Sequence, residues 1–397
     1  MIDLIIPVFR GIDQTRRCIE SVFASRQRTA LEVIVVDDCS PEPAIGEYLR
    51  ALAGDHRITL IRNEANEGFV RSVNRGMSWH ADRDVVLLNS DTEVANDWVD
   101  RLRSAAYSTP RVATVTPFSN NATICSYPYE GANTGVPGRL GLAALDRVFA
   151  TANAGRSFEL PTAVGFCMLI RRECLDEIGP FDAERFGRGY GEENDFCMRA
   201  AKAGWRNILA ADVFVFHEGS VSFQSERQAR AKAANDALVE IHPEYTQKVR
   251  DFIVADPLRS LRDAIDRARV AQGTEEALAV VAERATEQVQ WVARFRQVEA
   301  FVARRDADVG ELHAALEEAQ SLVAEGRLAL DDAIAERMRT VAERDELIAQ
   351  LREGLAHSES LAFSRLAELK AIQSYWLWRP YRILLNVRSP QPPRKEN

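Results

Sequence analysis

The sequence predicts an α/β fold, with a mixed or parallel sheet flanked by helices, followed by a long helical extension. In residues 1–250, short runs rich in Ile, Val and Leu alternate with stretches of helical periodicity, as in βαβ units. From 258 to 371 there is no proline and there are only four glycines, as expected of long helices. With 46% hydrophobic residues in 397, the chain can build a substantial core, which excludes collagen-like and wholly disordered classes.

The elements of the predicted sheet follow one another in a regular order. A helix is expected over 13–25, where Cys18, Ile19 and Val22 recur at helical spacing. A second helix is expected to begin at the carboxylates near 192 and to end at about 203. The expected strands are short, apolar and bounded by polar or turn residues, and they cover 1–8, 32–37, 59–62, 84–89, 160–171 and 207–216.

The residues just after each strand are unusually polar. Asp37 and Asp38 follow the second strand, and Asn89, Ser90 and Asp91 follow the fourth. In open α/β sheets, ligands bind beyond the carboxyl ends of the strands, so a site is expected at this edge. No GxGxxG or GxxxxGK[ST] motif follows any strand, which removes the main support for a dinucleotide-dependent dehydrogenase or a P-loop protein.

Charge and residue composition divide the chain into three parts: a domain over 1–250, a helical hairpin or imperfect coiled coil over 251–371, and an amphipathic segment over 372–397. Residues 1–250 carry a net charge of −5, residues 251–369 carry −9 and residues 370–397 carry +5. Heptad-like apolar positions within 258–371 indicate self-association. The aromatic and basic end indicates contact with an anionic membrane surface, with a partner or with the first domain.

Composition also limits the partners and the compartment. The acidic balance argues against a nucleic-acid partner, which normally requires a basic face. The first apolar run is closed by Pro7, so neither a signal peptide nor a spanning helix is expected there, and a cytoplasmic location follows. The six cysteines lack CxxC pairs and zinc-ligand spacing, and are expected to be reduced and mostly buried.

Eight short motifs occur in a characteristic order along the first 250 residues. They are IIPVF at 5–9, VVDDCS at 35–40, NEGFVRSVNRG at 66–76, LLNSDTEV at 87–94, GFCMLIRRE at 165–173, GPFD at 179–182, GYGEENDFC at 189–197 and FHEGSVS at 216–222. Together they resemble family 2 glycosyltransferases of the GT-A fold, particularly the rhamnosyltransferase-like branch of bacterial surface-polysaccharide enzymes. The part beyond about 250 has no share in this resemblance.

The resemblance implies an inverting transferase that moves a sugar from a nucleoside diphosphate to a hydroxyl of a glycan or lipid-linked acceptor. The chemistry requires a divalent cation, Mg²⁺ or Mn²⁺, to balance the charge of the leaving diphosphate. It also requires a carboxylate that takes the proton of the acceptor hydroxyl. A lipid-linked acceptor would place the enzyme on the cytoplasmic face of the inner membrane.

The resemblance assigns the metal to residues near two strand ends. Asp91 matches the final carboxylate of the family's Asp-x-Asp motif, whose first position is Asn89 here, with Ser90 between them. His217 matches a metal-contacting histidine of several members, and Glu93 is a further candidate ligand. The alternatives are a strand-end carboxylate that caps a turn and a hydrogen-bonded surface histidine.

The resemblance places the general base in the acidic run of GYGEENDFC. Glu193 aligns with the family's base, although glutamate replaces aspartate at this position, and Asp195 is a competitor. The alternative is a solvated acidic helix start without a catalytic role.

The nucleotide is expected to contact the ends of the first four strands. In the loop after the third strand, Val73 stands where the family commonly has arginine, and Arg71 is a possible substitute. The candidate nucleotide-binding residues are Pro7, Val8, Phe9, Asp37, Asp38, Asn66, Gly68, Arg71, Asn74, Asn89 and Ser90.

Two rival functions stay open at this point. A glycoside hydrolase also needs two carboxylates, but not an Asp-Asp pair and a metal motif at one edge. A nucleotide-binding scaffold would act through its coiled coil alone. The sugar also stays open, because the motifs favour deoxythymidine diphosphate rhamnose while neighbouring members use UDP-hexoses.

Overall fold

The computed structural model describes residues 1–187, 189–219, 224–324, 338, 342–350, 352–354, 358 and 365. The chain divides into two compact units, Met1–Arg284 and Ala285–Asn397. The first unit contains the sheet and all the residues assigned above to the site.

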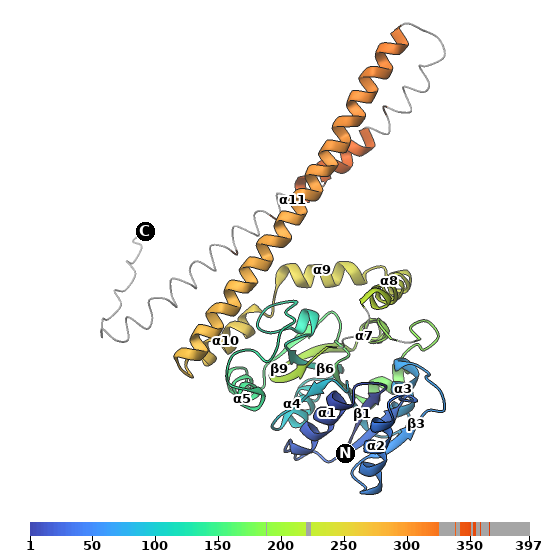
Figure 1. Cartoon of the computed structure of the whole chain (residues 1–397), viewed down its shortest axis with the longest axis vertical. Helices are drawn as coiled ribbons and strands as arrows, with labels where there is room; N and C mark the ends of the chain where they lie inside the picture. Colours follow the sequence, from blue (N-terminus) through green and yellow to red (C-terminus); the bar gives the residue numbers. More distant parts are fainter. Residues whose placement is uncertain are drawn as a thin grey trace, which may run out of the picture. The chain divides into compact units, whose positions relative to one another are not determined.

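A nine-stranded mixed sheet forms the centre of the first unit (Figure 1). Along the main path the strand order is β3-β2-β1-β4-β8-β6-β9-β5, and β7 pairs with β9. The first four strands in this order are parallel, whereas β8 is antiparallel to both of its neighbours. The strands are β1 (Ile2–Val8), β2 (Leu31–Asp37), β3 (Thr59–Arg62), β4 (Asp84–Leu88), β5 (Thr92–Glu93), β6 (Val112–Ser119), β7 (Ser157–Leu160), β8 (Cys167–Ile170) and β9 (Arg206–His217).

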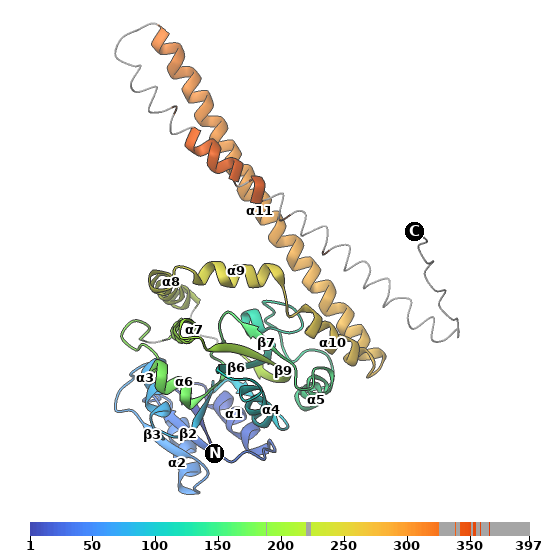
Figure 2. The same ribbon diagram turned by 180° about the vertical axis from the view of Figure 1, so that it is seen from behind.

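Helices cover both faces of this sheet (Figures 1 and 2). One apolar core lies under α1 (Ile12–Ala24), α2 (Pro43–Gly54), α4 (Trp98–Ala106) and α5 (Leu142–Ala152). The other lies under α3 (Phe69–Met77), α6 (Arg172–Ile178) and α7 (Glu192–Lys202). Side chains of β1 alternate between the two cores, with Leu4 and Ile6 in the first and Ile5 in the second. The predicted α/β class with a mixed sheet is confirmed.

The predicted strand over 160–171 is wrong in its extent. The structure has β7 before it and β8 at its end, and the residues between them form a non-strand connection. Pro161 cannot donate a ladder hydrogen bond, which ends β7. The connection then approaches the carboxyl edge of the sheet, where the carbonyl of Phe166 accepts a hydrogen bond from the backbone of Asn89 at 2.8 Å.

In the described residues up to 324, four helices follow the last strand: α8 (Gln224–Ile241), α9 (Tyr245–Ala255), α10 (Arg259–Val270) and α11 (Thr274–Ala324). Leu258, Leu261 and Ile265 are buried in the core beneath α1 and α5, so the first compact unit ends at Arg284, beyond the predicted boundary at 250. The short 3-10 helix η1 (Thr123–Cys125) lies between β6 and α5.

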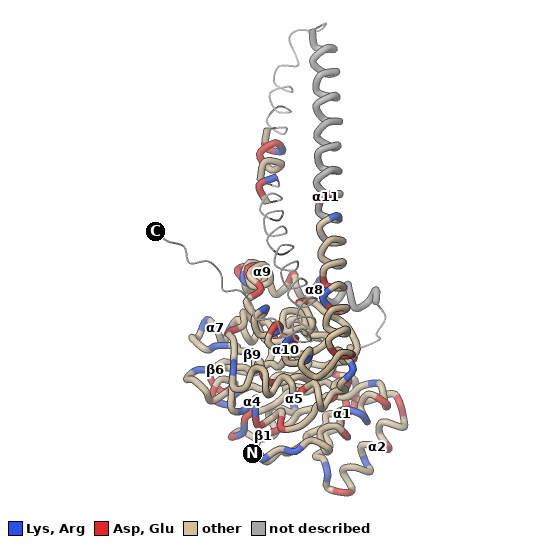
Figure 3. Tube along the Cα trace, turned by 90° about the vertical axis from the view of Figure 1, so that its left-hand side faces the viewer, with Lys and Arg blue, Asp and Glu red and all other residues tan. Residues whose placement is uncertain are grey.

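The helical extension is described in part. Helix α11 continues into the second unit, and residues 342–350 are also helical. The predicted amphipathic segment over 372–397 lies outside the described residues. Among the described helices, none is both long and apolar enough to cross a membrane. Acidic and basic residues are interspersed along the first unit (Figure 3).

Candidate active site

The carboxyl ends of the parallel strands bring several predicted nucleotide-binding residues to one edge. In the β1–β2 ladder, Pro7 pairs with Val36 and Val8 with Asp37. The backbone N–H of Asp38 then donates to the carbonyl of Val8 at 2.8 Å, which extends the pairing beyond the last ladder residues. Asp37 and Asp38 are both buried.

Asp38 holds the next loop at this edge. Its Oδ1 accepts hydrogen bonds from Nδ2 of Asn63 and from the backbone of Glu67, both at 2.8 Å, and its Oδ2 accepts from the backbone of Gly68 at 2.9 Å. A carboxylate with three donors is a strong organiser of local backbone. Asp38 therefore fixes the loop over 63–68.

Some of the other predicted nucleotide-binding residues are exposed, whereas others form hydrogen bonds within the protein. Asn66 and Arg71 are exposed beside the loop. The amide of Asn74 instead forms two hydrogen bonds with the backbone of Phe181, donating at 2.8 Å and accepting at 3.1 Å. Asp37 accepts from the backbone of Ser40 at 2.8 Å. Asn74 thus ties α3 to the GPFD turn.

Asp91 and His217 lie together at the start of β5 and the end of β9. The antiparallel pairing of these strands places Thr92 opposite His217, and Oδ1 of Asp91 lies 3.5 Å from Nε2 of His217. Both side chains are less than one-fifth exposed. Asn89 and Ser90 precede them as half-buried residues of the turn after β4.

The ring of His217 is held in one orientation. Its Nδ1 lies 2.8 Å from the backbone oxygen of Asn121, and because a carbonyl oxygen only accepts, Nδ1 carries the proton. In the neutral ring Nε2 then presents its lone pair toward the Asp91 carboxylate. One imidazole nitrogen and one carboxylate in this arrangement, with a backbone carbonyl behind the histidine, fit a divalent cation.

Glu93 is not brought into this pair. Its carboxylate accepts from Nε of Arg17 on α1 at 3.0 Å, and Arg17 also pairs with Glu218, the residue after His217. Among the described side chains, no third His, Cys, Asp or Glu lies within 4.8 Å of both Asp91 and His217. Arg17 therefore links the two strands that carry the pair, and Glu93 is engaged in this link.

Two adjacent carboxyl groups open α7. Gly191 precedes them with φ of +91°, a left-handed conformation that favours glycine. The Oε2 atoms of Glu192 and Glu193 are buried and accept no hydrogen bond from any described residue. Burial raises the pKa of Glu193, and burial together with the charge of Glu193 raises the pKa of Glu192 well above its usual value.

Residues 165 and 166 connect this carboxyl pair with the Asp91–His217 pair. Gly165 packs beside Glu193, since a Cβ built on Gly165 would lie 3.6 Å from Cγ of Glu193. The ring of Phe166 stacks on His217, with ring centroids 5.2 Å apart and planes inclined by 15°. Consecutive residues thus contact the predicted base and a predicted metal ligand, which places both at one edge of the sheet.

Both carboxylate oxygens of Asp195, the other candidate base, have hydrogen-bond partners within the protein. Its Oδ2 accepts from Nε of Arg199 at 2.8 Å, and its Oδ1 lies 2.9 Å from Nε2 of His242. Both Asp195 and His242 are buried. Asp195 joins α7 to the residues between α8 and α9, while Oε2 of Glu193 has no described partner.

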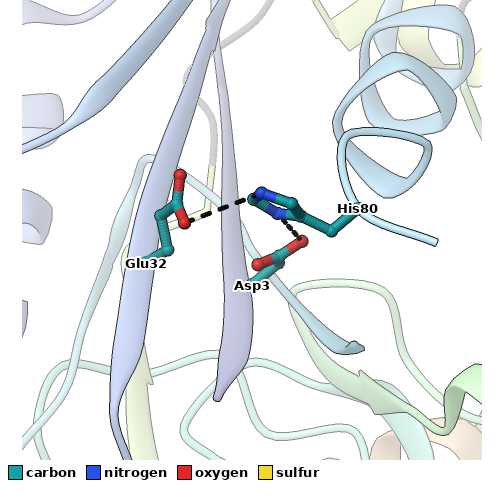
Figure 4. A group of neighbouring side chains, drawn as sticks. All are labelled: Asp3, Glu32 and His80. Carbon is teal, nitrogen blue, oxygen red and sulfur yellow. Dashed lines mark hydrogen bonds and ion pairs between the residues drawn. The ribbon is translucent and has the colours of Figure 1, made fainter. Parts of the chain in front are cut away.

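A second cluster of possible metal ligands lies near the starts of β1 and β2 (Figure 4). Nδ1 of His80 lies 2.9 Å from Oδ2 of Asp3, and Nε2 lies 3.9 Å from Oε2 of Glu32. Nη1 of Arg83 already pairs with both carboxylates, at 3.0 Å and 2.7 Å. Although burial acts to raise the pKa of Glu32, hydrogen bonds from Arg83 and Thr59 hold it below its usual value. The arginine supplies the positive charge that a metal would supply, so this cluster is an ion-pair network.

Sequence reasoning missed three residues that hold the site: Phe166, Asn120 and His242. Phe166 lies within the GFCMLIRRE motif, so the motif signalled a role without specifying it. Asn120 follows β6 directly, and its side chain forms hydrogen bonds with the backbone N–H and carbonyl of His217; its place at a strand end was the available signal. His242 lies outside all eight motifs, and only the packing of α8 and α9 brings it to Asp195.

Comparisons with known proteins agree with this architecture. Residues 3–179 match the family model of glycosyl transferase family 2. The chain is 27% identical over 198 residues to polypeptide N-acetylgalactosaminyltransferase 4 of Caenorhabditis elegans, a match that covers 47% of this chain and 33% of that protein. It is 26% identical over 203 residues to N-acetylglucosaminyl-diphospho-decaprenol L-rhamnosyltransferase of Mycobacterium tuberculosis, covering 45% of this chain and 62% of that protein.

One similar solved structure is a mannosyltransferase of Pyrobaculum calidifontis in complex with GDP-mannose and Mn²⁺. It has a TM-score of 0.46 and 19% identity, and the match covers 72% of this chain and 80% of that one. The chain spans less than two thirds of the length of both curated relatives.

The mixed sheet with helices on both faces is the architecture expected of the GT-A fold. Residues 3–179, the part that matches the model of glycosyl transferase family 2, extend from β1 to beyond β8 of this sheet. The match agrees with the predicted family over this part of the chain.

Proposed function

We propose that this protein is an inverting, metal-dependent glycosyltransferase that transfers a sugar from a nucleoside diphosphate to a hydroxyl group of a glycan or lipid-linked acceptor. The observation that carries the proposal is the junction at residues 165 and 166. Gly165 packs beside the buried carboxyl group of Glu193, and Phe166 stacks on His217 of the Asp91–His217 pair.

In the proposed reaction, Glu193 takes the proton of the acceptor hydroxyl. The hydroxyl oxygen forms a bond to the anomeric carbon on the face opposite the diphosphate, and the bond from that carbon to the diphosphate oxygen breaks. The electron pair of the broken bond leaves with the nucleoside diphosphate. A raised pKa makes Glu193 a stronger base than an ordinary glutamate, so it suits a weakly acidic hydroxyl.

Asp91 and His217 would hold Mg²⁺ or Mn²⁺, which when bound would balance the negative charge of the diphosphate. The Asp38-organised loop over 63–68 and the ends of β1 and β2 would hold the nucleoside. Asn66 and Arg71 are exposed beside that loop and can reach a ligand from solvent. Orientation of donor and acceptor supplies the remaining part of the rate enhancement.

We also propose a donor and an acceptor. The motif resemblance favours deoxythymidine diphosphate rhamnose, with UDP-hexoses as the alternative. The relative from M. tuberculosis is named for rhamnosyl transfer to a decaprenol-linked acceptor, which favours a lipid-linked acceptor here. We therefore propose a role in bacterial surface-polysaccharide synthesis, at the cytoplasmic face of the inner membrane.

The deciding experiment combines a thermal-shift panel with turnover. The purified chain is tested against nucleotide sugars with Mn²⁺, and the release of nucleoside diphosphate is then measured with the stabilising donor and a polyprenyl-diphosphate sugar acceptor. Glu193→Gln should keep the thermal shift and lose transfer. Near-normal turnover of this variant would contradict the proposed base, and product formation by the wild type would exclude the scaffold alternative.

Self-association belongs to the same proposal. Leu278, Val281 and Val289 are exposed on α11 and lie on one side of the helix by their spacing. A second copy of the chain could cover them. Light scattering of the full chain and of a Leu278→Arg, Val281→Arg variant tests this point, and removal of residues 372–397 followed by liposome sedimentation tests membrane contact.

A further inference from the structure

The predicted metal histidine is held by the segment over 119–139, which begins at the last residue of β6. The side chain of Asn120 is fully buried and accepts from the backbone N–H of His217 at 2.8 Å. Its Nδ2 donates to the carbonyl of His217 at 2.9 Å and to that of Thr134 at 2.6 Å. The next carbonyl, of Asn121, accepts from Nδ1 of His217. One segment therefore fixes both the backbone and the ring of His217.

The same segment is tied to α10 and the first turns of α11 by buried charged groups. The hydroxyl of Tyr127 donates to Oδ1 of Asp266 at 2.7 Å and accepts from Nη1 of Arg269 at 2.7 Å. Arg269 also pairs at 2.5 Å with Glu276 and with Glu283. All of these residues belong to the unit Met1–Arg284.

The carboxylates that pair with Arg269 also hold the segment's backbone. Glu283 accepts from the N–H of Gly138 at 2.9 Å, and Glu276 accepts from the N–H of Arg139 at 2.8 Å. Gly138 has φ of +76°, and a Cβ there would overlap the Glu276 carboxylate, so the close approach requires glycine. Because Arg269 is fully buried, its loss would leave two carboxylates without their cation and would release this end of the segment.

We propose that α10 and the first turns of α11 position the metal-binding histidine through the segment over 119–139, with Asn120 and Arg269 as positioning residues. This inference rests on the proposed metal-dependent function. It gives residues beyond 250 an indirect part in the metal site, through the segment that holds His217. The groups behind a metal-ligating histidine set its orientation, and their loss typically lowers metal affinity about 10- to 100-fold.

The test measures Mn²⁺ binding by electron paramagnetic resonance, with UDP and in a parallel series with dTDP, on full-length variants. Arg269→Gln and Asn120→Asp should weaken Mn²⁺ binding about tenfold or more. Arg83→Gln is the matched control, because it also removes an arginine that pairs with two carboxylates, at the opposite end of β1 and β2. It should lower the melting temperature and leave Mn²⁺ affinity within about twofold of the wild type. Equal affinities in the Arg269, Asn120 and Arg83 variants would overturn the inference.

Two further variants separate the possible failures. If Arg269→Gln does not fold, Tyr127→Phe replaces it in the test, because this variant removes only one hydroxyl group from the cluster. An Mn²⁺ affinity about threefold weaker or more would support the inference, and wild-type affinity would overturn it. His217→Ala should lose Mn²⁺ binding. Wild-type affinity in His217→Ala would overturn the proposed metal site and this inference together, whereas loss in His217→Ala with no loss in the positioning variants would overturn this inference alone.

Discussion

Nε2 of His242 lies 2.9 Å from Oδ1 of Asp195, and both residues are buried. The second carboxylate oxygen of Asp195 accepts from Arg199 at 2.8 Å. With both of its oxygens accepting hydrogen bonds, from Arg199 and from His242, Asp195 is better suited to hold α7 against the following helices than to take a proton from an acceptor. The two carboxylates that the sequence left as rivals thus differ in their surroundings.

Asp195→Asn should therefore act mainly on stability. The change weakens two charge-assisted hydrogen bonds and should lower the free energy of unfolding by about 2 kcal/mol. Transfer activity should fall less than about tenfold, against a loss of about a hundredfold or more for Glu193→Gln. Urea unfolding and initial rates on the same preparations check this. Equal losses of activity in both variants, with unchanged unfolding of Asp195→Asn, would return Asp195 to the role of base.

Ionisation of Glu193, in the first turn of α7, should change activity and stability in opposite directions as the pH rises. Glu193 must be ionised to accept a proton, and since burial raises its pKa, the acid limb of the pH–rate profile should lie above the usual glutamate value. A carboxyl group whose pKa is higher in the folded state stabilises the fold below its unfolded pKa, and this contribution is lost as the pH rises through the folded pKa. Activity should rise over the pH range in which this stabilisation declines.

Glu192→Gln isolates the stability part of that prediction. The pKa of Glu192 is raised by burial and by the charge of Glu193, so its ionisation at neutral pH costs folding free energy. The neutral variant should gain stability relative to the wild type as the pH increases, with transfer retained. Melting temperatures measured from pH 5 to pH 8 check this. A constant difference between variant and wild type across that range would contradict the prediction.

The sequence was most informative about the residues at strand ends and helix starts. Asp38, Asp91 and Glu193 were predicted because they follow strands or open a helix within short motifs, and the structure places Asp38 and Asp91 after strands and Glu193 in the first turn of α7. Long-range side-chain partners could not be found in this way. The pairing of Glu93 with Arg17 depends on how α1 lies against β5, which no local pattern encodes.

The same limit explains the error over 160–171 and applies to the packing of α10 within the first unit, beyond residue 250. The apolar run over 160–171 contains the connection between β7 and β8. Pro161 and Gly165 act only locally, whereas the lengths of the two strands are set by the pairing of β7 with β9 and of β8 with β4. Helix α10 resembles the rest of the helical extension in composition. Its docking depends on Arg269 and Tyr127, which are 142 residues apart in sequence.

Asp38 and Asn66 should separate loop organisation from ligand contact. Asp38→Ala removes the acceptor of three hydrogen bonds from residues 63–68, so it should lower both the melting temperature and donor affinity. Asn66→Ala changes an exposed side chain and should lower donor affinity with an unchanged melting temperature. Calorimetric titration with the donor and thermal melting check both. Unaltered stability of Asp38→Ala would show that the loop holds its conformation without the carboxylate.

Removal of divalent metal should abolish transfer without unfolding the protein, and two histidine variants locate the effect. His217→Ala removes the ring whose Nε2 lies 3.5 Å from Asp91, and should raise the Mn²⁺ concentration for half-maximal activity about tenfold or more. His80→Ala removes a histidine that also faces a carboxylate, but there Arg83 already balances Asp3 and Glu32. It should lower the melting temperature and leave the Mn²⁺ requirement unchanged. Activity of the wild type in excess EDTA would contradict the metal requirement, and an altered Mn²⁺ requirement in His80→Ala would show that the cluster at the starts of β1 and β2 also binds the cation.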